Sequence, residues 1–210
     1  MLRKVLLATD GSKDAALAAR AAADVCEGTG SELHVVHVWF YIPTARLRPF
    51  MRHELKKRGE ELLEEGVKKV EESGGRVTET HLVEGRAADE ILDLAERIGA
   101  DLVVIGSRGF GAVGRIALGS VSEAVIHHSR CPVLVLRGGE DSWPPERVVF
   151  GDDGSEAARA ATSGPLFALT TARGPCCYTP TRGCRRWTPK AESSTLGSWT
   201  TSSGGRRMPC

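Results

Sequence analysis

Five glycines fall within the fifteen residues of segment 106–120, GSRGFGAVGRIALGS. Residues without a side chain let successive backbone N–H groups converge on one point, which is a way to bind an anion such as a phosphate. The segment joins a short apolar run, DLVVIG at 101–106, to a helix expected at 120–129. The partial positive charge at the N-terminus of that helix adds to the attraction. Residue type and spacing therefore predict a phosphate-binding loop.

Within this segment, GFGAVG at 109–114 matches the G-x-G-x-x-G pattern of dinucleotide-binding turns. That pattern belongs to the first strand–helix turn of its fold, with an acidic residue about 20 residues further on. Here it follows the fourth expected strand, the helix begins only at Ser120, and the apolar run PVLVLR occupies the place of the acid. A P-loop is excluded because no Gly-Lys-Ser/Thr sequence follows the glycines. We therefore reject both interpretations.

Two interpretations that need no ligand stay open for the same residues. A glycine-rich connection can simply be a flexible linker. Ser120 and Glu123 have the spacing of a capping box, which stabilises a helix start whether or not a ligand binds there.

The elements that position this loop alternate between strands and helices. Short apolar runs predict five strands, at 4–9, 32–39, 76–85, 101–106 and 132–137. Helical spacing of apolar residues predicts helices at 13–27, 53–73, 86–99 and 120–129. Pro43 and Pro49 both oppose a helix, so we expect an irregular connection between the second strand and the second helix. Strands joined by helical crossovers run parallel, which predicts an α/β fold with a five-stranded, parallel, doubly wound sheet.

Such sheets bind ligands beyond the carboxyl ends of their strands, where the strand order reverses. Two strand exits carry suitable loops: Asp10-Gly11-Ser12 follows the first strand, and the glycine segment follows the fourth. We expect both at the binding edge of the sheet. The Asp10–Ser12 stretch is also an ordinary turn in which Ser12 can cap the next helix.

The histidines do not suggest a metal site. His34 and His37 are three residues apart on one expected strand, so their side chains face opposite sides of the sheet. In the third expected strand Val77, Glu79 and His81 alternate with Thr78, Thr80 and Leu82. No Cys–His or Ser-His-Asp combination stands out. We therefore predict no catalytic and no metal-ligating residue.

Composition restricts the choice of partners and compartment. The formal net charge of +1 over 210 residues gives no overall field that would recruit nucleic acid or an anionic membrane. No apolar run approaches the roughly 20 residues of a membrane-spanning helix. The start MLRKVLLATDG shows no signal-peptide cleavage site. We expect a cytoplasmic protein with reduced cysteines.

The beginning of the chain recurs later. ERVVFGDDGSEAARAAT at 146–162 repeats the pattern of RKVLLATDGSKDAALAA at 3–19, at an offset of 143 residues. We expect a domain at 1–138, a linker at 139–146 and the start of a truncated second repeat at 147–174. Segment 175–210 has too few apolar residues to offset its ordering entropy. We interpret it as a disordered, out-of-frame continuation of the second repeat, with a native basic tail as the alternative.

The outer glycines of the first segment define another spacing: Gly106-x2-Gly109-x9-Gly119-Ser120. With the TDGS turn, the His37-Val38 pair and the CPVLVL run, this spacing resembles the ATP-binding loop of the universal stress protein family. The resemblance covers residues 1–138, and the partial repeat is similar to the tandem arrangement found in that family. It implies a Rossmann-like sheet of the adenine nucleotide alpha hydrolase type.

The resemblance also implies a ligand. ATP would bind, and Mg²⁺ would arrive with its phosphates. Glycines of the loop would approach the phosphates and ribose, two serine hydroxyls would bond phosphate oxygens, and a backbone group of the second strand would meet the adenine edge. Asp10 would hold the ribose or adenine end. The implied binding residues are Asp10, Val38, Gly106, Gly109, Gly119, Ser120 and Ser122.

The sequence therefore predicts an ATP-binding regulatory protein of the universal stress class. We expect binding rather than rapid turnover, because no positioned general base or arginine finger is visible. Slow ATP hydrolysis or autophosphorylation, with Ser120 or Ser122 near the γ-phosphate, is the enzymatic alternative. A structural dimer of the same fold that binds no nucleotide is the third. The apolar run 132–137 would be an exposed sheet edge unless it is paired, so we expect a homodimer through this strand.

Overall fold

The computed structural model describes residues 2–40, 49–109, 118–138 and 143–145, with the backbone alone at 49–50, 177–178, 185–188 and 198–201. The chain forms two compact units, Met1–Trp143 and Pro144–Cys210. In the second unit the strands β6 (Cys177–Tyr178), β7 (Arg185–Thr188) and β8 (Ser198–Thr201) pair antiparallel in the order β6-β7-β8.

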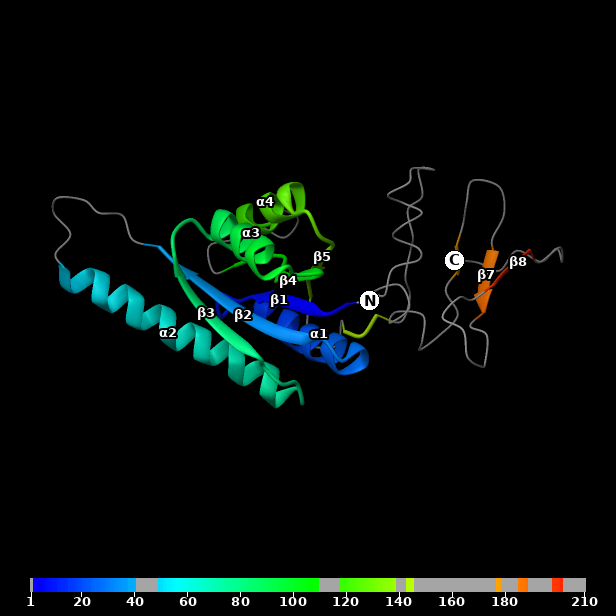
Figure 1. The fold of residues 1–210 in the computed structure, drawn as a ribbon, viewed down its shortest axis with the longest axis horizontal. Coiled ribbons are helices and arrows are strands. Elements are labelled where there is room, and N and C mark those ends of the chain that lie inside the picture. The colour runs from blue at the N-terminus through cyan, green and yellow to red at the C-terminus, as the bar shows by residue number, and fades with distance from the viewer. Residues whose placement is uncertain are drawn as a thin grey trace. The chain divides into compact units, whose positions relative to one another are not determined.

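The first unit alternates strands and helices from its start (Figure 1). Its elements are β1 (Lys4–Ala8), α1 (Lys13–Thr29), β2 (Glu32–Trp39), α2 (Pro49–Glu72), β3 (Glu79–Glu84), α3 (Ala87–Ile98), β4 (Leu102–Gly106), α4 (Ser120–His128) and β5 (Val133–Leu136). The five strands are parallel and lie in the order β3-β2-β1-β4-β5. The predicted α/β fold with a five-stranded, parallel, doubly wound sheet is confirmed.

Helices cover both faces of this sheet, α3 and α4 on one side and α1 and α2 on the other (Figure 1). Under α3 and α4, alternate strand residues such as Leu6, Val36 and Val103 pack against Ile91 and Leu94 of α3. The residues between them in sequence, such as Leu7 and Val104, face the other side and are fully buried. The central strands are apolar on both faces because both faces are covered.

Local signals explain where α1 begins and ends. The Ser12 hydroxyl accepts the backbone N–H of Ala15 at 3.2 Å, which caps the first turn as predicted. Gly30 takes a left-handed conformation and donates its N–H to the Cys26 carbonyl at 2.8 Å, which closes the helix. The helix ends two residues later than the alanine-rich pattern indicated.

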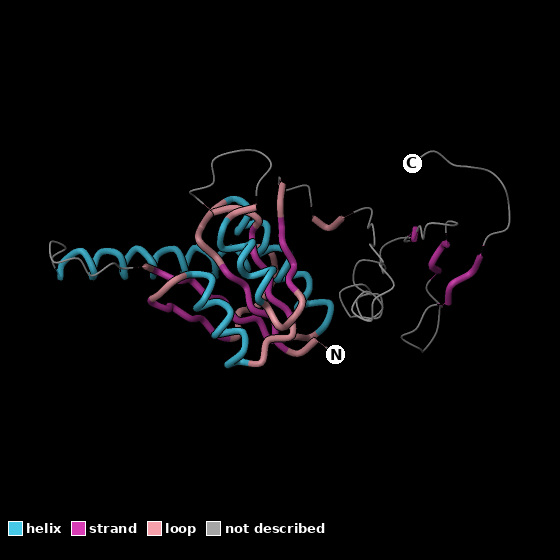
Figure 2. Tube along the Cα trace, turned by 90° about the horizontal axis from the view of Figure 1, so that it is seen from above, coloured by secondary structure: helices cyan, strands magenta, loops and turns pink. Residues whose placement is uncertain are grey.

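The starts of α2 and β3 differ most from the sequence prediction. Helix α2 begins at Pro49 rather than 53. A proline is tolerated at the first helical position, because the N–H that it lacks would have no hydrogen-bond partner within the helix there. Residues 51–58 at its beginning are exposed, and this end of α2 extends past the strands (Figure 2). Strand β3 starts at Glu79, three residues after the predicted start.

The domain organisation beyond β5 stays a prediction. Apart from residues 143–145, the predicted linker and second repeat lie outside the described residues. The strands β6, β7 and β8 fall in segment 175–210, where the sequence indicated no strand period. In the part of the chain that the structure describes, no helix combines the length and the apolar character needed to cross a membrane.

We predict that the core substitution Leu102→Ala lowers the free energy of unfolding by about 2–5 kcal/mol, because it leaves a cavity in a central strand that is covered on both faces. Leu55→Ala is the matched control, since Leu55 is 40% exposed on α2 and its truncation changes stability by less than about 0.5 kcal/mol. Urea denaturation followed by circular dichroism measures both. Equal losses would contradict the placement of Leu102 in the core.

Candidate functional site

A cavity of about 380 Å³ opens at the carboxyl ends of β1, β2 and β4. Its walls come from the ends of these strands, the first turns of α1, α3 and α4, and the loop after β4. All seven residues that the sequence singled out line it: Asp10, Val38, Gly106, Gly109, Gly119, Ser120 and Ser122. The structure therefore brings the predicted set together, while the role of each residue toward a ligand stays a prediction.

Gly106 ends β4 where the first turn of α1 passes directly over it. A Cβ atom on Gly106 would lie 2.7 Å from the carbonyl carbon of Asp14 and 2.8 Å from the amide nitrogen of Ala15. Backbone atoms cannot move aside as a flexible side chain can, so only glycine fits at this position. Gly106 thus has a packing role that does not depend on any ligand.

A buried carboxylate reinforces the same contact. Asp14 has a side chain only 7% exposed, and its Oδ2 accepts a hydrogen bond from the Ser107 hydroxyl at 2.8 Å. The Arg108 guanidinium Nε lies 3.4 Å from the same oxygen. The Ser12 hydroxyl, which caps α1, also donates to the Arg108 carbonyl at 3.0 Å. Residues just before and inside the first turn of α1 therefore fix the start of the glycine-rich loop.

Sequence reasoning did not single out Asp14. An acidic residue in the first turn of a helix is usually explained by the helix dipole alone, so its type gave no further signal. The structure pairs Arg108 with Asp14 on the wall of the cavity.

Asp10 and Gly109 approach each other across the mouth of the cavity. The half-buried Asp10 carboxylate accepts the Ser12 N–H through Oδ1 at 3.0 Å. Its Oδ2 occupies the space that a Cβ on Gly109 would need. The absence of a side chain at Gly109 leaves room for this carboxylate beside the loop.

The start of α4 differs from the capping-box interpretation. Gly119 is the N-cap, makes no side-chain capping bond, and donates its own N–H to the Ser107 carbonyl at 2.8 Å. Ser120 is already the first helical residue, so Ser120 and Glu123 do not form the box. The Ser120 side chain is exposed, and within residues 2–40, 49–109 and 118–138 its hydroxyl makes no hydrogen bond. It can therefore bond a ligand at the helix N-terminus.

The other polar groups of the cavity already have protein partners. Ser122 is buried and donates its hydroxyl proton to the Gly106 carbonyl at 2.8 Å, so bonding a phosphate would require it to give up that bond. His37 Nδ1 lies 2.8 Å from the Thr9 carbonyl oxygen, which can only accept, so Nδ1 carries the proton. Val38 is half-buried and packs against the core beneath α3.

A family model for the universal stress protein family matches residues 1–137. The chain belongs to this family. A universal stress protein of Thermus aquaticus is 38% identical over 137 residues, covering 65% of this chain and 100% of the relative.

Solved structures of universal stress proteins show the same fold. One of them, solved in complex with cAMP, has a TM-score of 0.53 at 25% identity and covers 65% of this chain and 97% of its own. The universal stress protein of Archaeoglobus fulgidus, solved in complex with dAMP, has a TM-score of 0.50 at 28% identity. The match covers 65% of this chain and 98% of that protein's chain.

We predict that Asp14→Ala lowers the free energy of unfolding of this universal stress protein by about 3 kcal/mol or more, because Ser107 and Arg108 lose their buried partner. Asp89→Ala is the control. Asp89 also lies in a first helical turn, but its side chain is 62% exposed and its ion pair with Arg86 contributes less than about 1 kcal/mol. Urea titration of both variants gives the difference, and similar small losses would rule out the buried role of Asp14.

Proposed function

We propose that this universal stress protein binds an adenine nucleotide, with ATP as its physiological ligand, and acts in the cytoplasm as a nucleotide-dependent regulatory module of the stress response. The observation that supports this most is the convergence of the seven predicted residues on one cavity at the carboxyl edge of the sheet. Two related proteins of the family were solved with cAMP and dAMP, which share the adenine nucleotide chemistry.

The cavity has an apolar part and a polar part, as a nucleotide requires. Val36, Val38, Ile91 and Ile105 form a wall against which a planar base can lie. On the other side, the N–H groups at the start of α4 and the hydroxyl of Ser120 face the opening, where phosphates would be attracted by the helix dipole. A volume of about 380 Å³ lies within the usual range for small-molecule sites, roughly 300–1,000 Å³.

Charge restricts the orientation of the ligand. The Asp10 carboxylate repels phosphates and suits the hydroxyl groups of a ribose. The positive charge of Arg108 is shared with Asp14, so the phosphates depend chiefly on backbone N–H groups and on Ser120. Mg²⁺ would arrive with the phosphates of ATP.

The ionisable residues of the cavity wall support binding over rapid turnover. Among the residues that the structure describes they are Asp10, His37 and Arg108, and each has a structural partner: the Ser12 N–H, the Thr9 carbonyl and the Asp14 carboxylate. None of them is positioned as a general base toward the start of α4. Slow ATP hydrolysis or autophosphorylation through Ser120 stays the alternative, and phosphate release by the purified protein that is lost in Gly119→Val would favour it.

We predict that protein purified under native conditions retains adenine nucleotide detectable by mass spectrometry. Ser120→Ala should weaken ATP binding about threefold to tenfold, the equivalent of one net hydrogen bond of about 0.5–1.5 kcal/mol. Thr80→Ala is the matched control, because it removes an exposed hydroxyl on β3 that does not line the cavity. Calorimetric titration with ATP and with AMP measures each affinity. Failure of the wild-type protein to bind either nucleotide at millimolar concentration would overturn the proposal.

We also infer a homodimer that forms through β5. This strand is one edge of the five-stranded sheet, and Val133, Leu134 and Val135 are only half-buried in the described part of the chain. The Pro132 and Leu136 carbonyls accept hydrogen bonds from Val103 and Ser107 of the β4 side. The backbone N–H and C=O groups of the even-numbered residues therefore point toward β4. The backbone N–H of Val135 points the other way, toward the open edge of the sheet. An apolar edge strand with outward N–H groups can pair with a strand of a second copy of the chain.

We predict a dimer in size-exclusion chromatography with light scattering. Val135→Pro should shift the protein to a monomer, because proline removes an outward donor while the hydrogen bonds between β4 and β5 stay intact. Circular dichroism checks that the variant is folded. A wild-type protein that elutes as a clean monomer contradicts the inference.

A further inference from the structure

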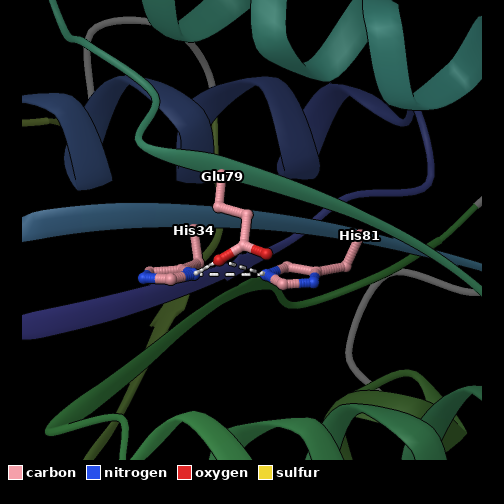
Figure 3. Close-up of side chains that lie close together, drawn as sticks. All are labelled: His34, Glu79 and His81. Carbon is pink, nitrogen blue, oxygen red and sulfur yellow. Dashed lines mark hydrogen bonds and ion pairs between the residues drawn. The ribbon is translucent and has the colours of Figure 1, made fainter.

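A second polar cluster lies on the sheet at the opposite end of β2 from the cavity, and consists of His34, Glu79 and His81 (Figure 3). The register pairs His34 with Glu79 and Val36 with His81. Because side chains alternate along a strand, all three residues of the cluster project from the same face, beneath α3. The cluster does not line the cavity.

The three side chains present their ligand atoms to one another. His34 Nδ1 lies 3.2 Å from His81 Nε2 and 3.5 Å from Glu79 Oε2, and His81 Nε2 lies 4.0 Å from the same oxygen. Around a tetrahedral Zn²⁺ with bonds of about 2.0–2.1 Å, neighbouring ligand atoms are about 3.3 Å apart. The observed spacing is close to this value, and a small rotation of the exposed Glu79 side chain closes the set.

The cluster is buried on one side and open on the other. The His34 side chain is 5% exposed and that of His81 16%, whereas that of Glu79 is 60% exposed. Two imidazoles are thus held rigidly by the sheet, and the carboxylate side gives an ion and a water ligand access from solvent. This arrangement corresponds to an open site with three protein ligands.

One nitrogen of His34 is unpartnered. Among the buried side-chain nitrogen and oxygen atoms that the structure describes, only His34 Nε2 has no hydrogen-bond partner. It faces the Glu32 carboxylate at 3.7 Å, beyond hydrogen-bond distance. If Nδ1 gives its lone pair to a cation, Nε2 carries the proton and points it at that carboxylate. Metal-ligating histidines usually have such an acidic or carbonyl neighbour.

Charged groups of both signs surround His81. Burial lowers the pKa of His81, Glu79 raises it, and the neighbouring His34 and Arg97 lower it further. The net direction of the His81 pKa is downward. The positive charge of Arg97 opposes a cation, and the carboxylates of Glu79 and Glu32 act in the other direction.

We propose that His34, Glu79 and His81 form a Zn²⁺ site with water as the fourth ligand. Imidazole nitrogens with a single carboxylate suit Zn²⁺, whereas Mg²⁺ and Ca²⁺ prefer sets made of oxygen. The site lies about 13 Å along β2 from Val38, since four residues of a strand rise about 3.3 Å each. It is therefore separate from the cavity at the carboxyl edge and does not depend on the nucleotide.

The test is calorimetric titration of the full chain with Zn²⁺ alone, without nucleotide. We expect the wild-type protein to bind one ion at this site, and His81→Gln and Glu79→Gln to weaken that binding by at least about tenfold. Both substitutions are at positions more exposed than the buried His34, so the fold is retained, which circular dichroism checks. Glu84→Gln is the matched control, because Glu84 lies on β3 but faces the other side and pairs with exposed Arg52.

Co²⁺ identifies the ligands of the bound ion. A tetrahedral nitrogen and oxygen site gives visible absorption without a thiolate charge-transfer band, so binding to the chain's six cysteines is distinguishable. The expected result is visible absorption that disappears in His81→Gln and stays in Glu84→Gln. Wild-type protein that binds no Zn²⁺ in the micromolar range would overturn the proposal. So would Zn²⁺ or Co²⁺ binding that His81→Gln leaves unchanged.

Discussion

The close contact between the first turn of α1 and the end of β4 determines the geometry of the whole carboxyl edge. At Gly106 the backbone of α1 comes so near that no Cβ fits between them. The buried Asp14 carboxylate then joins α1 to Ser107 and Arg108 beyond the strand. Since an unpaired buried charge is costly, helix and loop cannot separate without losing these partners.

The cavity follows from this contact and from the strand order. β1 and β4 are neighbours in the centre of the sheet, but the chain leaves β1 toward α1 on one face and β4 toward α4 on the other. The two connections therefore diverge and leave a crevice between them. The Gly119 N–H bonded to the Ser107 carbonyl sets where α4 begins, so the helix N-terminus faces this crevice. A binding edge arises from packing before any ligand is considered.

Much of this could be predicted from the sequence because its signals are local. Apolar runs, a serine cap and crossover helices indicated the parallel sheet. Because ligands of such sheets bind beyond the carboxyl ends of the strands, Asp10 and the glycines were expected at the same edge. The start of α2 was predicted too late because of Pro49. A proline opposes a helix in its interior but is favourable at its first position, and the local sequence does not distinguish the two. Gly119 rather than Ser120 caps α4 for a tertiary reason, its bond to Ser107.

The contacts between strands were beyond sequence reasoning. His34 and His37 were rejected as a metal pair because they lie on opposite faces of one strand. The partners of His34 lie instead on β3, and they meet it only through the register that pairs His34 with Glu79. The spacing of 45 residues between paired positions has no periodic signature, because a crossover helix of any length could intervene. Glu79 and His81 were recognised as sharing a face, but nothing in the sequence showed what that face would contact.

The distribution of buried polar groups separates the two ends of the sheet. Thr9, Ser12, Asp14, His37, Ser107 and Ser122 all lie near the carboxyl edge, and each has a hydrogen-bond partner there. His34 is the remaining buried polar residue in the described part of the chain, and it lies near the amino end with one nitrogen unsatisfied. A buried unpaired nitrogen costs about 1–3 kcal/mol relative to a satisfied one. That nitrogen faces the Glu32 carboxylate at 3.7 Å, so the proposed Zn²⁺ at Nδ1 would fix the tautomer in which Nε2 directs its proton toward Glu32.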